Sequence, residues 1–353
     1  MAEDLKPEID DDRPVHADTP LPPEVQAPLA EYHGAEPASP QWFKDAIAQE
    51  PERIFVESLG SLLEVLTWGA VGKPGLLFVH GNSAHADWWS FIAPFFADDY
   101  RVASMSLAGM GASDWRERYS FTDFAEDAEA VARATGLYEG GRKPIYIGHS
   151  FGGGQVFFAA VRNPERMHAA VMVDTGFGPP PEELAKRQAQ MEAIRNIPTM
   201  DRASRVYPTI EAALLRFRLM PPQPAGNPYI ADFIARRSLK RVPLPEGENR
   251  EDGSGEGWTW RFDPNMWGKL DRDRAMGGDP SQPVSTTTPM VHIYGAKSRI
   301  VEHRKSGAPS PFPPGLIEIE IPDAHHHIMI DQPLALVAAL RALLATWPPE
   351  LAS

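Results

Sequence analysis

Short apolar runs alternate with amphipathic stretches in two parts of the chain, from about residue 53 to 174 and again from about 290 to 347. The run from Gly75 to Val79 is apolar throughout, which is typical of a strand buried on both faces of a parallel sheet. We therefore predict a sheet of α/β type. Its expected strands are Arg53 to Ser58, Leu62 to Trp68, Gly75 to Val79, Arg101 to Ser106, the run that ends at Gly148, Ala169 to Asp174, Met290 to Tyr294 and Leu316 to Ile321.

Helices are expected between these strands. Trp88 and Trp89 begin one that runs to about Phe96. The sequence from Ser120 to Asp123 is a capping-box pattern and opens an amphipathic helix that extends to about Thr135. Leu334 to Trp347 has the 3.6-residue apolar spacing of a helix that closes the domain.

The first 40 residues have a different composition. They hold ten acids against two bases, and eight prolines. Such a stretch can neither form a long helix nor bury much apolar surface, so we expect residues 1–40 to be disordered or draped over the surface. A partner-binding tail is the alternative, although a solvated extension is the simpler reading.

The sheet pattern stops between Thr175 and about Pro289, where Pro, Arg, Met and Trp dominate. Within this stretch, residues 244–257 are rich in Gly, Glu and Asp and are predicted to form a mobile loop. We expect residues 41–175 and 288–353 to form one core domain, with residues 176–287 inserted into it.

Composition and net charge exclude several classes of partner and of functional site. The 353 residues carry a net charge of −14, which argues against nucleic acid or an anionic membrane as partner, because both would be repelled. The chain has no cysteine, which excludes disulfides, thiolate metal sites and a cysteine nucleophile. No secretory signal pattern and no apolar run of membrane-spanning length is visible, so a soluble, cytoplasmic protein is expected.

A candidate catalytic motif is Gly148-His149-Ser150-Phe151-Gly152, which follows an apolar run and precedes a stretch with helical composition. A strand, a sharp turn and a helix would leave Ser150 exposed at a helix N-terminus, with glycines two positions away on each side allowing close approach. The amide of Phe151 would then point at whatever Ser150 attacks. An incidental serine in a glycine-rich turn is the alternative.

This turn resembles the nucleophile elbow of the α/β-hydrolase family. Further motifs follow in the family's order, over residues 53 to 348. His80-Gly81-Asn82 looks like its oxyanion loop, which makes the amide of Asn82 a candidate donor, and Gly109-Met110-Gly111-Ala112-Ser113 matches its Gly-x-Gly-x-Ser loop. The resemblance implies a mostly parallel eight-stranded sheet with flanking helices. It also implies that residues 176–287 are a large, mainly helical cap inserted after the sixth strand.

The same resemblance assigns a histidine and an acid to Ser150. His326 lies five residues before Asp331, as the family's catalytic histidine lies before an acid. His325 and His327 are expected to be packing or loop residues, and a metal site made of three consecutive histidines is disfavoured because their side chains point in different directions.

The acid is expected after the sixth strand, at Asp174, which lies 24 residues beyond Ser150. The family's commoner position, after the seventh strand, is occupied here by Ser298. Asp174 could instead cap a helix while Asp323 or Glu302 orients the histidine.

These residues imply a serine hydrolase that cleaves an ester, lactone or amide of a small organic substrate, without metal or cofactor. Alternatives are hydrolysis of a carbon–carbon bond with the same triad, or a member of the fold that binds a ligand without turnover. Ser rather than Asp at the elbow argues against a haloalkane dehalogenase or an epoxide hydrolase. The substrate and the oligomeric state cannot be read from the sequence.

Overall fold

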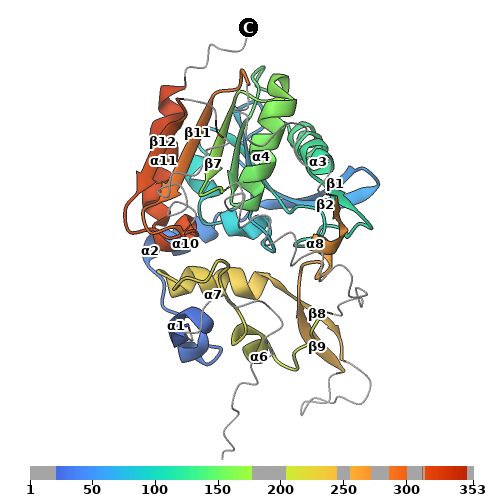
Figure 1. The fold of residues 1–353 in the computed structure, drawn as a ribbon, viewed down its shortest axis with the longest axis vertical. Helices are drawn as coiled ribbons and strands as arrows, with labels where there is room; N and C mark the ends of the chain where they lie inside the picture. Colours follow the sequence, from blue (N-terminus) through green and yellow to red (C-terminus); the bar gives the residue numbers. More distant parts are fainter. Residues whose placement is uncertain are drawn as a thin grey trace, which may run out of the picture.

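The computed structural model describes residues 21–176, 204–244, 255–271, 286–299, 312 and 315–347. Its centre is an eight-stranded sheet with the strand order β1-β2-β4-β3-β6-β7-β11-β12 (Figure 1). Strand β1 pairs with β2, and β2 with β4, in antiparallel fashion, whereas the other neighbours are parallel. The mostly parallel eight-stranded sheet that the sequence predicts is therefore confirmed. The strands are β1 (Glu52–Ser58), β2 (Ser61–Trp68), β3 (Gly75–Val79), β4 (Arg101–Met105), β6 (Ile145–His149), β7 (Ala169–Val173), β11 (Met290–Gly295) and β12 (Ile317–Ile321).

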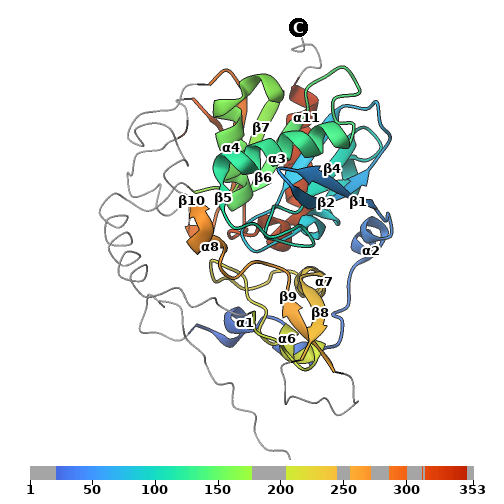
Figure 2. The same cartoon turned by 90° about the vertical axis from the view of Figure 1, so that its right-hand side faces the viewer.

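Apolar clusters cover both faces of this sheet. On one face pack α3 (Phe121–Ala134) and α4 (Phe151–Arg162), as Figure 2 shows from the side. Helix α11 (Pro333–Thr346) packs on the other face, together with α2 (Gln41–Ile47). The central strands β3, β4, β6 and β7 are buried along their whole length, as the continuous apolar sequence of Gly75 to Val79 predicts for β3.

The helix expected from Trp88 to Phe96 is instead a pair of short 3₁₀ helices, η2 (Ala86–Trp89) and η3 (Ala93–Phe96). Pro94 explains the difference, because proline lacks a backbone N–H and its ring clashes with the carbonyl four residues earlier in an α-helix. Trp89 and Phe96 are nevertheless buried, so the apolar pattern is satisfied by a different local structure.

Residues 204–244 and 255–271, between β7 and β11, gather at one end of the sheet (Figures 1 and 2). They form α6 (Ile210–Leu214), α7 (Pro228–Arg237), α8 (Met266–Lys269), and an antiparallel hairpin of β8 (Leu239–Pro243) and β9 (Glu256–Trp260). The sequence analysis did not predict this hairpin, since each strand has only five residues. Strand β10 (Leu270–Asp271) pairs with β5 (Tyr119–Ser120) and joins this segment to the core.

Residues 21–40 lie along α6 and α7. They include α1 (Pro23–Gln26) and η1 (Ala30–Tyr32). The side chain of Leu29 is only 3% exposed and belongs to the core. Arg236 of α7 donates a hydrogen bond to the carbonyl of Gly34. Residues 1–20, residues 245–254 of the predicted mobile loop, and Glu302 lie outside the described residues.

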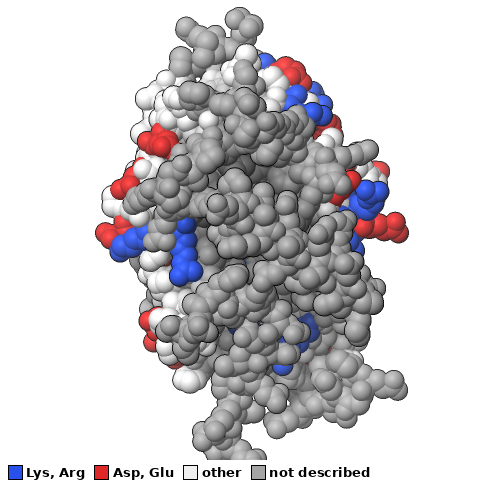
Figure 3. All heavy atoms as spheres, viewed as in Figure 1, with Lys and Arg blue, Asp and Glu red and all other residues white. Residues whose placement is uncertain are grey.

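One face of the molecule shows charges of both signs among the described residues. On the face shown in Figure 3, the visible Lys and Arg side chains lie among Asp and Glu side chains rather than in one patch. None of the helices in the described part of the chain is both long enough and apolar enough to cross a membrane.

Candidate active site

Ser150 stands at the turn between β6 and α4 with φ 53° and ψ −116°, a conformation that L-residues rarely adopt. Its backbone N–H donates to the carbonyl of Val173 in the neighbouring strand, which holds the turn. Strand and helix approach so closely that a Cβ at Gly148 would collide with the backbone of Gly152, and a Cβ at Gly152 with the carbonyl of His80. The glycine spacing in the sequence therefore has a direct steric cause.

The structure brings Ser150, His326 and Asp174 together in one chain of hydrogen bonds. The Oγ of Ser150 lies 2.9 Å from Nε2 of His326, and Nδ1 of His326 lies 2.6 Å from Oδ2 of Asp174. Ser150 follows β6, Asp174 follows β7, and His326 follows β12, so all three lie at the carboxyl ends of parallel strands. A histidine held in this way can accept the serine proton while the carboxylate stabilises its charged form.

Asp174 is fully buried and accepts three hydrogen bonds. Besides His326, its donors are the backbone N–H of Gly295, at 2.9 Å, and the hydroxyl of Ser298, at 2.6 Å. Ser298, which occupies the position where the sequence analysis looked for an acid, thus supports the carboxylate of Asp174 instead. The alternative acid Asp323 is exposed and pairs with Lys297.

Gly81 and Asn82 lie beside the nucleophile. A Cβ built on Gly81 would be 3.4 Å from the Cβ of Ser150, and Asn82 follows directly with an exposed side chain. On the other side, the amide of Phe151 belongs to the first turn of α4, a helix of 12 residues. Gly81, which precedes Asn82, therefore lies close to Ser150, and the amide of Phe151 directly follows it in the chain.

His80 fixes the start of this loop. Its Nδ1–H donates to the carbonyl of Gly81 at 2.7 Å, while its Nε2 accepts from the backbone N–H of Leu107 at 2.9 Å. Burial lowers the pKa of His80 to about 3, so the ring is neutral at physiological pH. A neutral ring is also what this geometry requires, because Nε2 must keep its lone pair to accept from Leu107.

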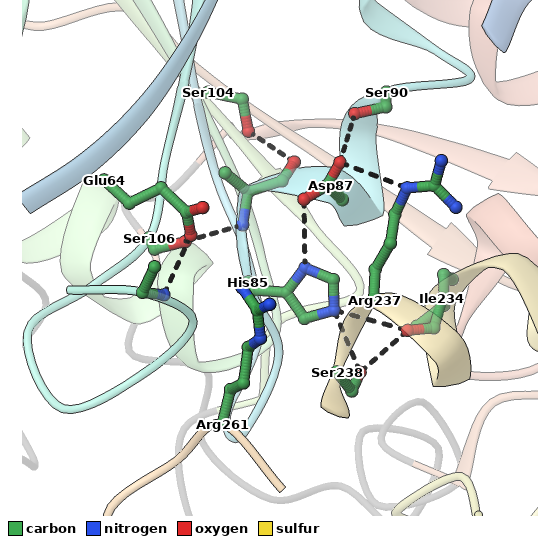
Figure 4. Close-up of polar contacts among 12 residues, drawn as sticks. Glu64, His85, Asp87, Ser90, Ser104, Ser106, Ile234, Arg237, Ser238 and Arg261 are labelled. Atoms are coloured by element: carbon green, nitrogen blue, oxygen red, sulfur yellow. Dashed lines mark hydrogen bonds and ion pairs between the residues drawn. The ribbon is translucent and has the colours of Figure 1, made fainter. Parts of the chain in front are cut away.

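A polar cluster supports the far end of the same loop (Figure 4). The carboxylate of Asp87 lies 3.7 Å from the ring of His85 and 3.5 Å from the guanidinium of Arg237 in α7. It also pairs with Arg53 of β1, and Nε2 of His85 lies 2.9 Å from the hydroxyl of Ser238. Burial opposes the ionisation of Asp87, but the neighbouring His85 and Arg53 side chains hold its pKa below the usual range. The loop is therefore fastened to both β1 and α7.

The elbow residue His149 reaches the loop that carries His326. Its Nε2–H donates to the backbone carbonyl of His326 at 2.9 Å, and the two rings pack with centroids 4.8 Å apart. Burial lowers the pKa of His149 well below its usual value, so it contacts His326 as a neutral ring. The sequence analysis gave His149 no role, although its place directly before Ser150 was a signal.

Aromatic side chains line one side of the elbow. The ring of Phe151 contacts Phe121 and Phe124 of α3, and it meets Trp267 of α8 with centroids 5.5 Å apart. Trp267 is 45% exposed, whereas Trp260 packs against Phe217 within the segment between β7 and β11. The surroundings of Phe151 are therefore apolar and are shared between α3, α4 and α8.

Comparison with known proteins agrees with this geometry. Residues 76–340 match the alpha/beta hydrolase family. The chain belongs to this family. Among curated members, it is 30% identical over 113 residues to the lipase LipV of Mycobacterium tuberculosis, a match covering 32% of this chain and 41% of the relative. It is 31% identical over 100 residues to a bifunctional esterase/perhydrolase of Acinetobacter calcoaceticus, covering 28% of this chain and 34% of the relative.

These sequence matches span well under half of each relative's own length. Solved structures cover more of the chain and show the fold. A thioesterase domain from the curacin biosynthetic pathway has a TM-score of 0.65 and 19% identity, over 84% of this chain and 99% of that domain. An esterase from Mycobacterium tuberculosis has a TM-score of 0.55 and 21% identity, over 93% of this chain and 99% of that one. Membership of the alpha/beta hydrolase family, with esterase and lipase relatives, supports hydrolase activity.

Proposed function

We propose that this protein is a serine hydrolase that cleaves an ester, lactone or amide of a small organic substrate through an acyl-enzyme. The observation that carries the proposal is the continuous chain from Ser150 Oγ to His326 Nε2, at 2.9 Å, and from His326 Nδ1 to Asp174, at 2.6 Å. A serine hydroxyl is a weak nucleophile at neutral pH, and this arrangement supplies both the base it needs and the carboxylate that orients the base.

In the proposed reaction, Ser150 Oγ attacks the substrate carbonyl while its proton passes to Nε2 of His326. Asp174 accepts a hydrogen bond from Nδ1–H of His326 and stabilises the imidazolium. The backbone amides of Asn82 and Phe151 donate hydrogen bonds to the oxyanion. His326 then gives its proton to the departing alcohol or amine, which leaves the acyl group on Ser150. Water attacks this ester and loses a proton to His326, which then returns that proton to Ser150 Oγ as the acid is released.

Ester chemistry is the favoured variant of this proposal because two relatives are described as a lipase and as an esterase/perhydrolase. The aromatic surroundings of Phe151, one residue from the nucleophile, suit an apolar part of such a substrate. As part of the same proposal, residues 41–175 and 288–353 form the core domain, and residues 176–287 form a cap at the end of the sheet that carries Ser150.

The test is a panel of p-nitrophenyl esters, assayed beside a meta-cleavage product as a carbon–carbon substrate. We expect ester turnover that Ser150→Ala and His326→Ala each lower by several orders of magnitude in kcat, because triad members act as a unit. Circular dichroism of each variant serves as the control for folding. Turnover of the meta-cleavage product alone would replace the ester proposal with the carbon–carbon one, and saturable ligand binding without any turnover would leave a binding protein.

A further inference from the structure

Each of the three consecutive histidines after β12 is held by a different partner. His325 donates to Oδ2 of Asp331 from its backbone N–H, at 2.8 Å, and from its ring, at 2.9 Å. The carbonyl of His326 accepts from His149, and His327 donates to Oε1 of Gln223 from its backbone N–H, at 2.9 Å, and from Nδ1, at 2.8 Å. The backbone on both sides of the His326 side chain is therefore fixed by paired hydrogen bonds.

Gln223 differs from Asp331 and His149, the partners of His325 and His326, because it comes from the segment between β7 and β11. Its side chain is only 3% exposed, and its Nε2 donates to Oδ2 of Asp331 at 3.2 Å. Two neighbours bind the same short helix, α10 (Ile328–Asp331). The N–H of Gly226 donates to Asp331 Oδ1, and Asn227 donates to the carbonyl of Ile330. Residues 223–227 are thus fastened to the loop and helix that follow β12.

The orientation of the Gln223 amide follows from its partners. A backbone N–H can only donate, so the atom facing the N–H of His327 must be the amide oxygen, and the NH₂ group then faces the carboxylate of Asp331. The ring of His327 donates from Nδ1 to the same oxygen. Burial lowers the pKa of His327 well below its usual value, so this ring stays neutral and its proton stays on Nδ1.

We propose that Gln223 is a positioning residue for His326, which it holds through His327 and Asp331 at the distance needed to take the proton of Ser150. The inference rests on the proposed function, in which His326 is the base. It adds that a residue from the proposed cap helps to set the geometry of the base, so that a displacement of residues 223–227 would move His326. Misplacement of a reacting group by about 1 Å can cost about 100-fold in rate.

The test compares Gln223→Met with a matched control, Gln155→Met. Both glutamines are 3% exposed and methionine has a similar length, but within the described residues the amide of Gln155 has no hydrogen-bond partner and it lies on α4, away from the histidine loop. We expect Gln223→Met to lower kcat by about 10- to 100-fold with little change in KM. Gln155→Met should leave both constants at the wild-type value.

Gln223→Glu adds a readout that a merely structural role would not produce. Its carboxyl group would face Asp331 and His327, with His325 on the far side of Asp331. While protonated it can accept from His327 and donate to Asp331 as the amide does, and its proximity to Asp331 raises its pKa. We therefore expect activity close to wild type at low pH within the active range, and a loss of kcat on the alkaline side where wild type keeps its activity.

A second measurement separates failure of this inference from failure of the proposed function. The proton between His326 Nδ1 and Asp174 should give a strongly deshielded NMR signal, which does not depend on turnover. We expect the signal in wild type and Gln155→Met, and its shift or loss in folded Gln223→Met. An unchanged signal, or kcat falling equally in both methionine variants, would overturn the role of Gln223. Absence of ester turnover in wild type would count against the proposed function alone.

Discussion

Asp174 shows how much a single side chain depends on partners far away in the sequence. Its carboxylate receives hydrogen bonds from His326, Gly295 and Ser298, which lie more than 120 positions further along the chain. The chain order of the motifs and the spacing of 24 residues from Ser150 led to the prediction of Asp174, whose Oδ2 lies 2.6 Å from Nδ1 of His326 in the structure. Ser298 could not be predicted, because its hydrogen bond exists only once β7 and β11 lie side by side.

Asp174→Asn should preserve the fold and lower kcat by about 10³- to 10⁴-fold. The amide cannot stabilise an imidazolium, and its NH₂ group would face Nδ1 of His326 and favour the wrong tautomer. Asp323→Asn should cost far less, because Asp323 is exposed and pairs only with Lys297 among the described residues. Steady-state kinetics of both variants check this. A larger loss of kcat in Asp323→Asn than in Asp174→Asn would rule out Asp174 as the triad acid, without changing the roles assigned to Ser150 and His326.

Three buried histidines, His80, His149 and His327, have pKa values below the ordinary one because of burial. Well above pH 6.5 they are neutral in both the folded and the unfolded chain and have no effect on the pH dependence of stability. Below it, only the unfolded chain takes up protons. Each histidine should therefore lower the free energy of unfolding by about 1.4 kcal/mol per pH unit on the acid side.

Urea unfolding at pH 7.5, 6.5 and 5.5 measures this effect. We expect a small fall between the first two values, because the unfolded histidines are half protonated at pH 6.5, and a larger fall between the last two. His149→Gln keeps a donor for the carbonyl of His326 but removes one titrating group, so its fall should be shallower by about a third. Equal stability of wild type at all three pH values would show that these rings become protonated in the folded protein.

At the scale of elements, periodicity predicted every strand of the large sheet to within one residue at most ends. The prediction of Gly75 to Val79 succeeds because a continuous apolar run between turn signals is typical of a buried strand. The helix from Trp88 to Phe96 failed at Pro94, where local sterics override the apolar pattern. The hairpin of β8 and β9 was missed because five residues of alternation are too short to stand out.

At the scale of the whole molecule, the N-terminal residues 21–40 contact the core and the segment between β7 and β11. Leu29 is buried in the core, Gly34 binds Arg236 of α7, and Phe43 of the following α2 packs on Tyr229 and Phe233 of α7. Composition alone suggested a solvated extension, because a single buried leucine among prolines and acids carries no periodic signal.

Two truncations test residues 1–20 and residues 21–40 separately. Removing residues 1–20, which hold seven acids and two bases, should leave the melting temperature and kcat nearly unchanged, because their composition offers little apolar surface to dock. Removing residues 1–40 should lower the melting temperature, since burial of a leucine alone contributes about 1.5–3 kcal/mol. Thermal unfolding checks both. Equal melting temperatures for the two truncated forms would show that residues 21–40 add no stability.

The central claim is that His326 activates Ser150 as a nucleophile, and covalent labelling tests it most directly. Wild-type protein treated with a fluorophosphonate should gain one phosphonyl group, which peptide mass spectrometry should locate on Ser150. Ser150→Ala should gain none, and His326→Ala should react slower by orders of magnitude, because the serine then lacks its base. An adduct at another residue, or labelling of His326→Ala at the wild-type rate, would contradict the account.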